Sequence, residues 1–126
     1  MPRTAITAPG ASAVGPYSHA AEQHGFVYLS GQTPVEPGTT TLVGGGIEAQ
    51  TRQCFANLGA VLAAGGLGFD DVVKCNVFLT DMADFAAMNS VYAEQFEQPF
   101  PARTTIGVAS LPLGASVEIE LIARRS

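Results

Sequence analysis

One arginine and two glutamates near the C-terminal end are the residues of this chain best suited to do chemistry. Arg103 precedes an alternating run, residues 104–108, and Glu118 and Glu120 lie in a second alternating run, residues 117–121. Alternating apolar side chains are typical of half-buried strands, so we expect two strands joined by a turn. A guanidinium can bind an anion and a carboxylate can act as a general base, so a sheet face that carries both is either left in water or covered to form a polar pocket.

The alternation also predicts on which face these charges lie. Side chains along a strand point to alternate sides of the sheet. If the apolar residues of both runs face one core, Arg103 and Thr105 share the opposite face with Glu118 and Glu120. The apolar residues in question are Thr104, Ile106 and Val108 in the first run, and Val117, Ile119 and Leu121 in the second.

Length and composition limit the function classes. A chain of 126 residues predicts a single domain over residues 1–126. The net charge of -5 and only six Lys and Arg residues argue against binding to nucleic acid, because that affinity comes from clustered cations. A hydrophobic content of 47% with 13% charged residues is high for a small monomer, so we expect oligomers.

No basic and apolar leader opens the chain, so we expect a cytoplasmic protein. The longest uncharged stretch, residues 54–69, is too short to span a membrane, for which about 20 apolar residues are needed. Cys54 and Cys75 lie too far apart for a C-x-x-C redox or zinc motif and are expected to be buried small hydrophobes. We therefore expect no metal site and no membrane contact.

The N-terminal segment, residues 1–16, is rich in Pro, Gly, Ala and Ser and is interpreted as an extended arm or loop. Pro2 has an alternative interpretation, because a tautomerase can use an N-terminal proline as its base after loss of Met1. Tautomerases of that kind begin a strand at once, whereas this segment shows no sustained alternation. We keep the tautomerase as a minor alternative.

The remaining pattern predicts an α+β domain. We expect a hairpin over residues 17–30, a helix over 47–62, a strand over 72–80 in the middle of the sheet, and a helix that ends near Gln95. Asp81 and Asp84 suit the start of the second helix as N-cap and third helical residue. Each helix has one apolar stripe, so both should cover the same face of the sheet and leave the other face to pack against copies of the chain.

Six segments together resemble the RidA/YjgF family of imine deaminases, in their order and spacing, over nearly the whole chain. This resemblance implies a chorismate-mutase-like fold, a homotrimer packed sheet to sheet, and pockets between subunits. It also implies hydrolysis of 2-imino acids, or their enamine tautomers, to 2-oxo acids and ammonia without a cofactor. The segments are Gly15-Pro16-Tyr17, Leu29-Ser30-Gly31-Gln32, Val77-Phe78-Leu79-Thr80-Asp81-Met82, Asp84-Phe85, Phe100-Pro101-Ala102-Arg103 and Glu118-Ile119-Glu120.

The resemblance implies roles for single residues. Arg103 matches the arginine that binds the substrate carboxylate, a task that suits the planar guanidinium fork. Its alternative is a structural ion pair at an interface. Glu118 matches the glutamate that holds the attacking water, and Glu120 could take that role or pair with Arg103.

Five further positions complete the expected substrate site. Tyr17 and Ser30 match pocket-lining residues, and Gly31 brings its backbone close to the substrate. Asn89 lies near a family asparagine, or is simply a solvated side chain on a helix. Thr105 stands where many members have a cysteine; imine hydrolysis needs no thiol adduct, so its backbone can still contact the substrate.

Two other functions stay open. Some relatives resemble ligand-sensing or chaperone-like proteins, and a trimer of this kind could bind 2-oxo acids without turnover. The family also carries a ribonuclease label, but an acidic chain whose only histidines are His19 and His24 offers little for RNA cleavage.

Overall fold

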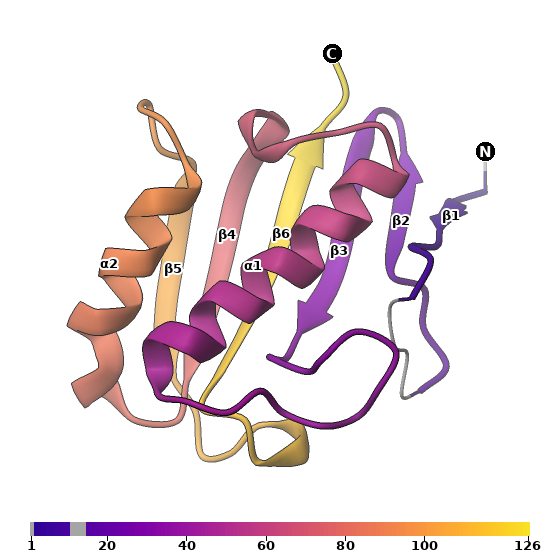
Figure 1. Cartoon of the computed structure of the whole chain (residues 1–126). Coiled ribbons are helices and arrows are strands. Elements are labelled where there is room, and N and C mark those ends of the chain that lie inside the picture. The colour runs from indigo at the N-terminus through magenta and orange to yellow at the C-terminus, as the bar shows by residue number, and fades with distance from the viewer. Residues whose placement is uncertain (1, 11–14) are drawn as a thin grey trace.

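A computed structural model describes residues 2–10 and 15–126 of the chain, and these form one six-stranded sheet with two α-helices (Figure 1). The strands follow the spatial order β1-β2-β3-β6-β4-β5. The elements are β1 (Thr4–Ile6), β2 (Ala20–Gln23), β3 (Phe26–Gln32), α1 (Ile47–Ala64), β4 (Val72–Leu79), α2 (Phe85–Gln95), β5 (Ala102–Gly107) and β6 (Val117–Arg124).

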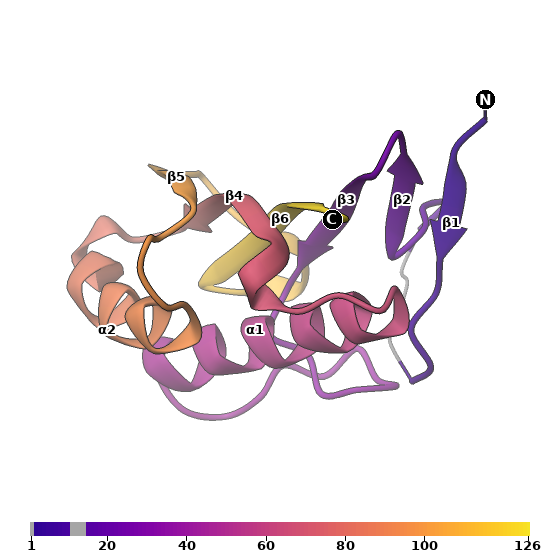
Figure 2. The ribbon, with the colours of Figure 1, turned by 90° about the horizontal axis from the view of Figure 1, so that it is seen from above.

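Both helices cover the same face of the sheet, as the single apolar stripe of each predicts (Figure 2). Phe55 and Leu58 of α1 and Met88 of α2 are fully buried against Val77 of β4 and Ile119 of β6. The α+β class, the two helices on one face and the interior position of β4 are therefore confirmed.

The helix ends follow the sequence signals. Helix α1 ends at Ala64 with Gly65 as its C-cap residue, and Gly66 adopts a φ of 73°, a left-handed conformation that glycine adopts without strain. Asp81 caps a short 3₁₀ turn, Met82–Asp84, by accepting a hydrogen bond from the Ala83 N–H at 2.9 Å. Because this turn comes first, α2 begins at Phe85, and Asp84 is its N-cap residue rather than its third helical residue as predicted.

The N-terminal arm contains a strand that alternation could not reveal. β1 has only three residues and pairs antiparallel with β2 at the edge of the sheet. The predicted arm also includes residues 11–14, which lie outside the described residues. β2 begins at Ala20 rather than at Tyr17, so the hairpin is shorter than expected.

The two C-terminal strands are not neighbours in the sheet. β4 lies between them, antiparallel to β6 and parallel to β5. The expectation of two strands joined by a turn is therefore wrong in its pairing, because 9 residues with a 3₁₀ turn, Pro112–Gly114, carry the chain from β5 past β4 to β6.

The expected placement of Arg103 is also wrong. Arg103 is level with Cys75 of β4, and Thr105 is level with Val77, and both of these β4 side chains are buried on the helix side. Glu120, by contrast, is level with Asn76 on the other side of the sheet. Arg103 and Thr105 thus face the helices, whereas both glutamates face away from them.

The physical reason for this error is that β5 is an edge strand. Its helix-facing side is only partly covered, so polar side chains are tolerated there. The apolar alternation instead marks its outer side, where Ile106 is 45% exposed.

The outer face of the sheet is not covered by either helix (Figure 2). It carries exposed apolar side chains, among them Tyr28 of β3 at 51% exposure, together with Lys74, Asn76 and the two glutamates. No helix in the described part of the chain is long and apolar enough to cross a membrane.

Candidate functional site

Arg103 is held between β5 and α2 by uncharged groups. Its Nη1 donates a hydrogen bond to Asn89 Oδ1 at 2.7 Å. The guanidinium carbon lies 4.6 Å from the ring centroid of Tyr92 and 5.5 Å from that of Phe85. Stacking on two aromatic rings and one amide bond fix the position of the charge without neutralising it.

Arg103 has no carboxylate partner among the described residues. The ion pairs found there join Arg52 to Glu94 and Arg125 to Glu22, each at 2.9 Å. A half-buried guanidinium without a counter-charge is costly unless an anion reaches it. The interpretation of Arg103 as a structural ion pair therefore has no support within one chain.

Beside Arg103 the surface is hollowed into a pocket of about 380 Å³, which we call the α2/β5 pocket. Arg103 and Asn89 supply its polar groups. The rest of its lining comes from Tyr92, Ala93, Phe100 and Pro101.

A group of buried, uncharged side chains lies next to the Arg103 guanidinium. The Tyr92 hydroxyl and the Thr105 hydroxyl are both buried, and the Thr105 hydroxyl makes no hydrogen bond to other described residues. The Cys75 thiol lies next to the Tyr92 hydroxyl. Burial raises the pKa of Cys75 to about 11 and also raises the pKa of Tyr92. Both groups are therefore uncharged at neutral pH, and neither competes with an incoming anion for Arg103.

The glutamates belong to a second pocket, on the outer face of the sheet, with a volume of about 410 Å³. We call it the β3/β6 pocket. It brings together five of the predicted site residues, from β3, from β6 and from the segment before β2. They are Tyr17, Ser30, Gly31, Glu118 and Glu120, and Thr33 and Pro112 complete the lining.

A β-bulge shapes this second pocket. Between two regular pairs, β3 has two residues, Ser30 and Gly31, where β6 has only Glu120. The Ser30 Oγ donates to the Ser18 carbonyl at 2.6 Å, which ties the bulge to the segment before β2. A Cβ atom at Gly31 would collide with Oε2 of Glu118, so only glycine lets this carboxylate lie against the strand.

The two glutamates have different environments. Burial raises the pKa of Glu118, and the neighbouring Glu120 raises it further. Glu120 accepts a hydrogen bond from Asn76 Nδ2 at 3.0 Å. Glu118 is therefore more basic than an ordinary glutamate, and Glu120 is held in place by a neighbouring amide.

The predicted site residues thus form two groups on opposite faces of one sheet. Arg103 and Asn89 line the α2/β5 pocket, and Glu118, Tyr17 and their neighbours line the β3/β6 pocket. Thr105 lines neither pocket, because its side chain points under the helix layer. A single chain cannot bring the two groups to one small ligand.

Sequence reasoning missed the aromatic support of Arg103. Phe85 and Tyr92 are part of the apolar stripe of α2 that predicted core packing, and they do pack against the core. Their second role, the support of the Arg103 guanidinium, requires Arg103 to face the helices. The apolar alternation on β5 predicted the opposite face, so this role was not predicted. The only available signal was the spacing of Phe85, Asn89 and Tyr92, which puts all three on one side of a helix.

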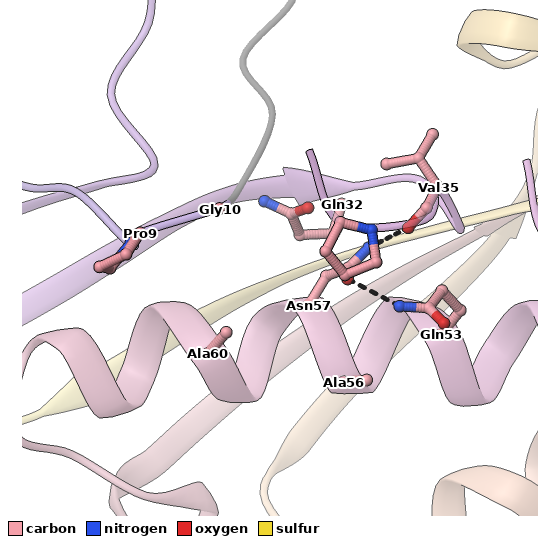
Figure 3. Close-up of a pocket in the computed structure, with 9 residues that line it drawn as sticks. Pro9, Gly10, Gln32, Val35, Gln53, Ala56, Asn57 and Ala60 are labelled. Carbon is pink, nitrogen blue, oxygen red and sulfur yellow. Dashed lines mark hydrogen bonds between the residues drawn. The ribbon is translucent and has the colours of Figure 1, made fainter. Parts of the chain in front are cut away.

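A smaller cavity of about 90 Å³ lies between α1 and the segment after β3 (Figure 3). Gln53 donates to Asn57 Oδ1 at 2.8 Å, and Asn57 Nδ2 donates to the Val35 carbonyl at 3.0 Å. The amide groups that line this cavity therefore fasten a loop to α1. None of the predicted site residues lines it.

The other reactive groups in the described part of the chain do not cluster. His19 is buried and its Nδ1 accepts from the Ala8 N–H at 3.1 Å, whereas His24 lies in the turn at the far end of β2. Cys54 is a buried free thiol that contacts the Gln32 carbonyl at 3.2 Å. Within the described residues no three His, Cys, Asp or Glu side chains are grouped so that they could hold a metal ion.

Comparisons with known proteins agree on one family. Residues 6–125 match the family described as Endoribonuclease L-PSP. The chain is 47% identical to Protein DfrA of Myxococcus xanthus, over 98% of this chain and 96% of that protein. It is 44% identical to the 2-iminobutanoate/2-iminopropanoate deaminase of Capra hircus, over 96% of this chain and 88% of that protein.

The fold is similar to that of solved relatives. One is TdcF of E. coli with bound serine, which superposes with a TM-score of 0.90 at 36% identity and covers 98% of this chain and 99% of that one. Sequence and fold therefore identify the same group of proteins, although the names within it differ.

Proposed function

Because this chain belongs to the RidA/YjgF family, we propose that it is a 2-imino acid deaminase that acts on substrates such as 2-iminobutanoate and 2-iminopropanoate. The reaction adds water to C2 of the imine and releases a 2-oxo acid and ammonia. Relatives named for this activity are 44% identical over almost the whole chain.

The single observation that carries this proposal is the state of Arg103. Its guanidinium is fixed by Asn89 and by the rings of Tyr92 and Phe85, yet no carboxylate of the described residues neutralises it. A 2-imino acid offers the missing carboxylate, which the guanidinium fork can bind through two hydrogen bonds. The relative with bound serine, an α-amino acid, supports a small carboxylate ligand.

Glu118 is the proposed base. Its raised pKa makes it a better proton acceptor for a water molecule that attacks C2 of the imine. Water adds to C2 of the protonated imine as one of its protons passes to Glu118, which gives a carbinolamine. Glu118 then donates this proton to the amino nitrogen, the C–N bond breaks as the C=O bond forms, and the departing ammonia takes up the hydroxyl proton and leaves as ammonium. Glu118 is thus regenerated, and the reaction consumes one water and needs no redox partner.

We propose that two copies of the chain build each site. Arg103 and Glu118 lie on opposite faces of the sheet, so a neighbour must bring its β3/β6 pocket to the α2/β5 pocket. The outer face that carries Glu118 also exposes Tyr28 and Ile106, which packing against copies would cover. A homotrimer packed sheet to sheet satisfies both requirements.

A coupled assay tests this function. An amino-acid oxidase or a dehydratase generates the imine, and the decay of the imine and the release of 2-oxo acid are followed with and without the purified protein. We expect wild-type protein and Arg52→Ala, which breaks only an exposed ion pair, to accelerate hydrolysis, and Arg103→Ala to fail. If wild-type protein binds 2-oxo acids but does not accelerate hydrolysis, the chain is a 2-oxo acid binding protein and the deaminase proposal is wrong.

A further inference from the structure

His19 is a buried histidine that has no part in the proposed reaction so far. It is 6% exposed and lies directly before β2, two residues after Tyr17, which lines the β3/β6 pocket. Its Nδ1 accepts a hydrogen bond from the backbone N–H of Ala8 at 3.1 Å, and Ala8 is also buried. Because a backbone N–H can only donate, Nδ1 carries no proton, and the imidazole is neutral with its proton on Nε2.

Ala8 belongs to the N-terminal arm, which is fastened at three places. The arm first pairs with β2 through β1, and Ala8 then packs into the core. Pro9 and Gly10 go on to line the cavity beside α1, together with Gln32, the last residue of β3 (Figure 3). The arm therefore runs from the edge of the sheet to the end of β3, and the bond to His19 lies midway along it.

His19 is also joined to the β-bulge of β3. The Ser30 N–H donates to the His19 carbonyl at 2.9 Å, and the Ser30 Oγ donates to the Ser18 carbonyl. Ser30 and Gly31 line the β3/β6 pocket, and the Glu118 carboxylate lies against Gly31. His19 thus holds the arm through its ring and the bulge through its backbone.

We propose that His19 is a positioning residue for the reaction. By accepting the Ala8 N–H, it fixes residues 17–19 and the bulge, and through the bulge it keeps the Glu118 carboxylate aligned with the attacking water. The inference rests on the proposed function, in which Glu118 is the base. Arg103 lies on β5, at the opposite edge of the sheet from β1, and its partners come from α2, so binding of the substrate carboxylate should not depend on the arm.

Three variants separate positioning from a merely structural role. His19→Leu removes the acceptor and keeps an apolar side chain in the core. His19→Asn keeps an acceptor, since its Oδ1 is as many bonds from the backbone as Nδ1, and it should rescue the contact. Arg125→Met is the matched control, because it breaks the ion pair with Glu22 and the bond to the Gly65 carbonyl at the end of β6 opposite to Glu118.

Hydrogen exchange of the Ala8 and Ser30 amides, followed by NMR on the whole protein, tests the coupling without any turnover. We expect both amides to be protected in the wild type and in His19→Asn, and to exchange about tenfold faster or more in His19→Leu. Arg125→Met should leave both rates unchanged. If the Ala8 amide of the wild type is unprotected, or if His19→Leu speeds exchange at Ala8 and not at Ser30, the inference is wrong.

Kinetics in the coupled assay test the consequence for the reaction. His19→Leu should lower kcat about tenfold, because a displaced base is less well aligned, and His19→Asn should keep most of it. The Kd of 2-oxobutanoate, measured by calorimetry, should change by less than about twofold in either variant, because Arg103 holds that ligand. Arg125→Met should lower Tm without lowering kcat. If His19→Leu behaves in the same way, its role is structural and the inference is wrong.

The outcomes also separate this inference from the proposed function. If the wild type hydrolyses no imine, the proposed function fails, and the exchange rates alone decide whether His19 couples the arm to Ser30. If His19→Leu does not fold, the wild type and His19→Asn decide: slow exchange of Ala8 in both supports the contact, and loss of kcat in a His19→Asn protein that keeps this protection overturns it.

Discussion

The two halves of the proposed site are built in different ways. Arg103 lies on a regular strand, beneath a regular helix, and every group that holds it is neutral. Glu118 lies beside a β-bulge, and a second carboxylate lies two residues further along the same strand. The first half preserves a full positive charge, whereas the second half makes a carboxylate more basic. This difference fits the proposed function, in which one half anchors the ligand and the other half reacts with it.

The largest effect is expected on the anchoring half. Arg103→Ala removes the only charge of the α2/β5 pocket, and we expect kcat/KM for imine hydrolysis to fall roughly a thousandfold, since a charged hydrogen-bonded partner is lost. Steady-state kinetics in the coupled assay measure this. The fold should survive, because the side chain is only half-buried.

Arg103→Lys sharpens the same prediction. Lysine keeps the charge but not the planar fork or the stacking on Tyr92, so this variant should recover only a small part of the activity. Full activity in Arg103→Lys would mean that binding a carboxylate through two hydrogen bonds is not the role of this residue.

The next largest effect is expected on the reacting half. Glu118→Gln keeps the shape but removes the basic oxygen, so kcat should fall roughly a hundredfold while binding of a 2-oxo acid persists. Glu120→Gln is the matched control. It should keep most of the turnover, because an amide can still contact Asn76. A dead Glu120→Gln and a normal Glu118→Gln would reverse the assignment of the two glutamates.

A smaller effect is expected when Glu118 is only displaced. Gly31→Ala puts a methyl group where the Glu118 carboxylate lies, and the flexible side chain should move away without loss of the fold. We expect about a tenfold lower kcat, since a displaced base is less well aligned with its water. Circular dichroism and oligomer size serve as controls, and unchanged kinetics in a folded variant would show that the position of Glu118 is not critical.

The smallest effect concerns stability. The pKa of Glu118 is raised in the native state, so the folded protein holds this proton more tightly than the unfolded chain does. Stability is therefore lost as pH rises from the unfolded pKa through the higher folded one. Glu118→Gln never ionises, so its Tm should exceed that of the wild type at neutral pH, and the difference should shrink on acidification. Thermal melts across this pH range that run in parallel would contradict the raised pKa.

Much of the fold could be predicted, because it depends on patterns that repeat over many residues. Helix α1 shows its apolar stripe over 18 residues and its glycine stop at Gly65, and β4 shows a nearly continuous apolar run. β1 escaped prediction because three residues are too few to establish a period. The pairing of β5 with β4 also escaped, since it depends on contacts between distant segments.

Most of the predicted site residues line a pocket, but they are divided between two pockets. Tyr17, Ser30, Gly31, Glu118 and Glu120 do line one pocket. Arg103 was assigned to the wrong face because alternation fixes two faces without saying which one is buried, and an edge strand leaves both partly exposed. Phe85 and Tyr92 stack on Arg103 only because Arg103 faces the helices. This contact could therefore not be predicted once Arg103 had been assigned to the opposite face.

The central claim is that Arg103 of one copy works with Glu118 of another, and mixed oligomers test it most directly. Arg103→Ala and Glu118→Gln chains, each nearly inactive alone, are co-expressed with different tags. The resulting oligomers are assayed as a mixture, without separating one composition from another. If each site uses two copies, about a quarter of the sites in a random equal mixture receive both intact residues, and activity should return to about a quarter of the wild-type value. If mixed oligomers form, as the two tags verify, and activity stays at the level of the single variants, both residues act within one chain and the account is contradicted.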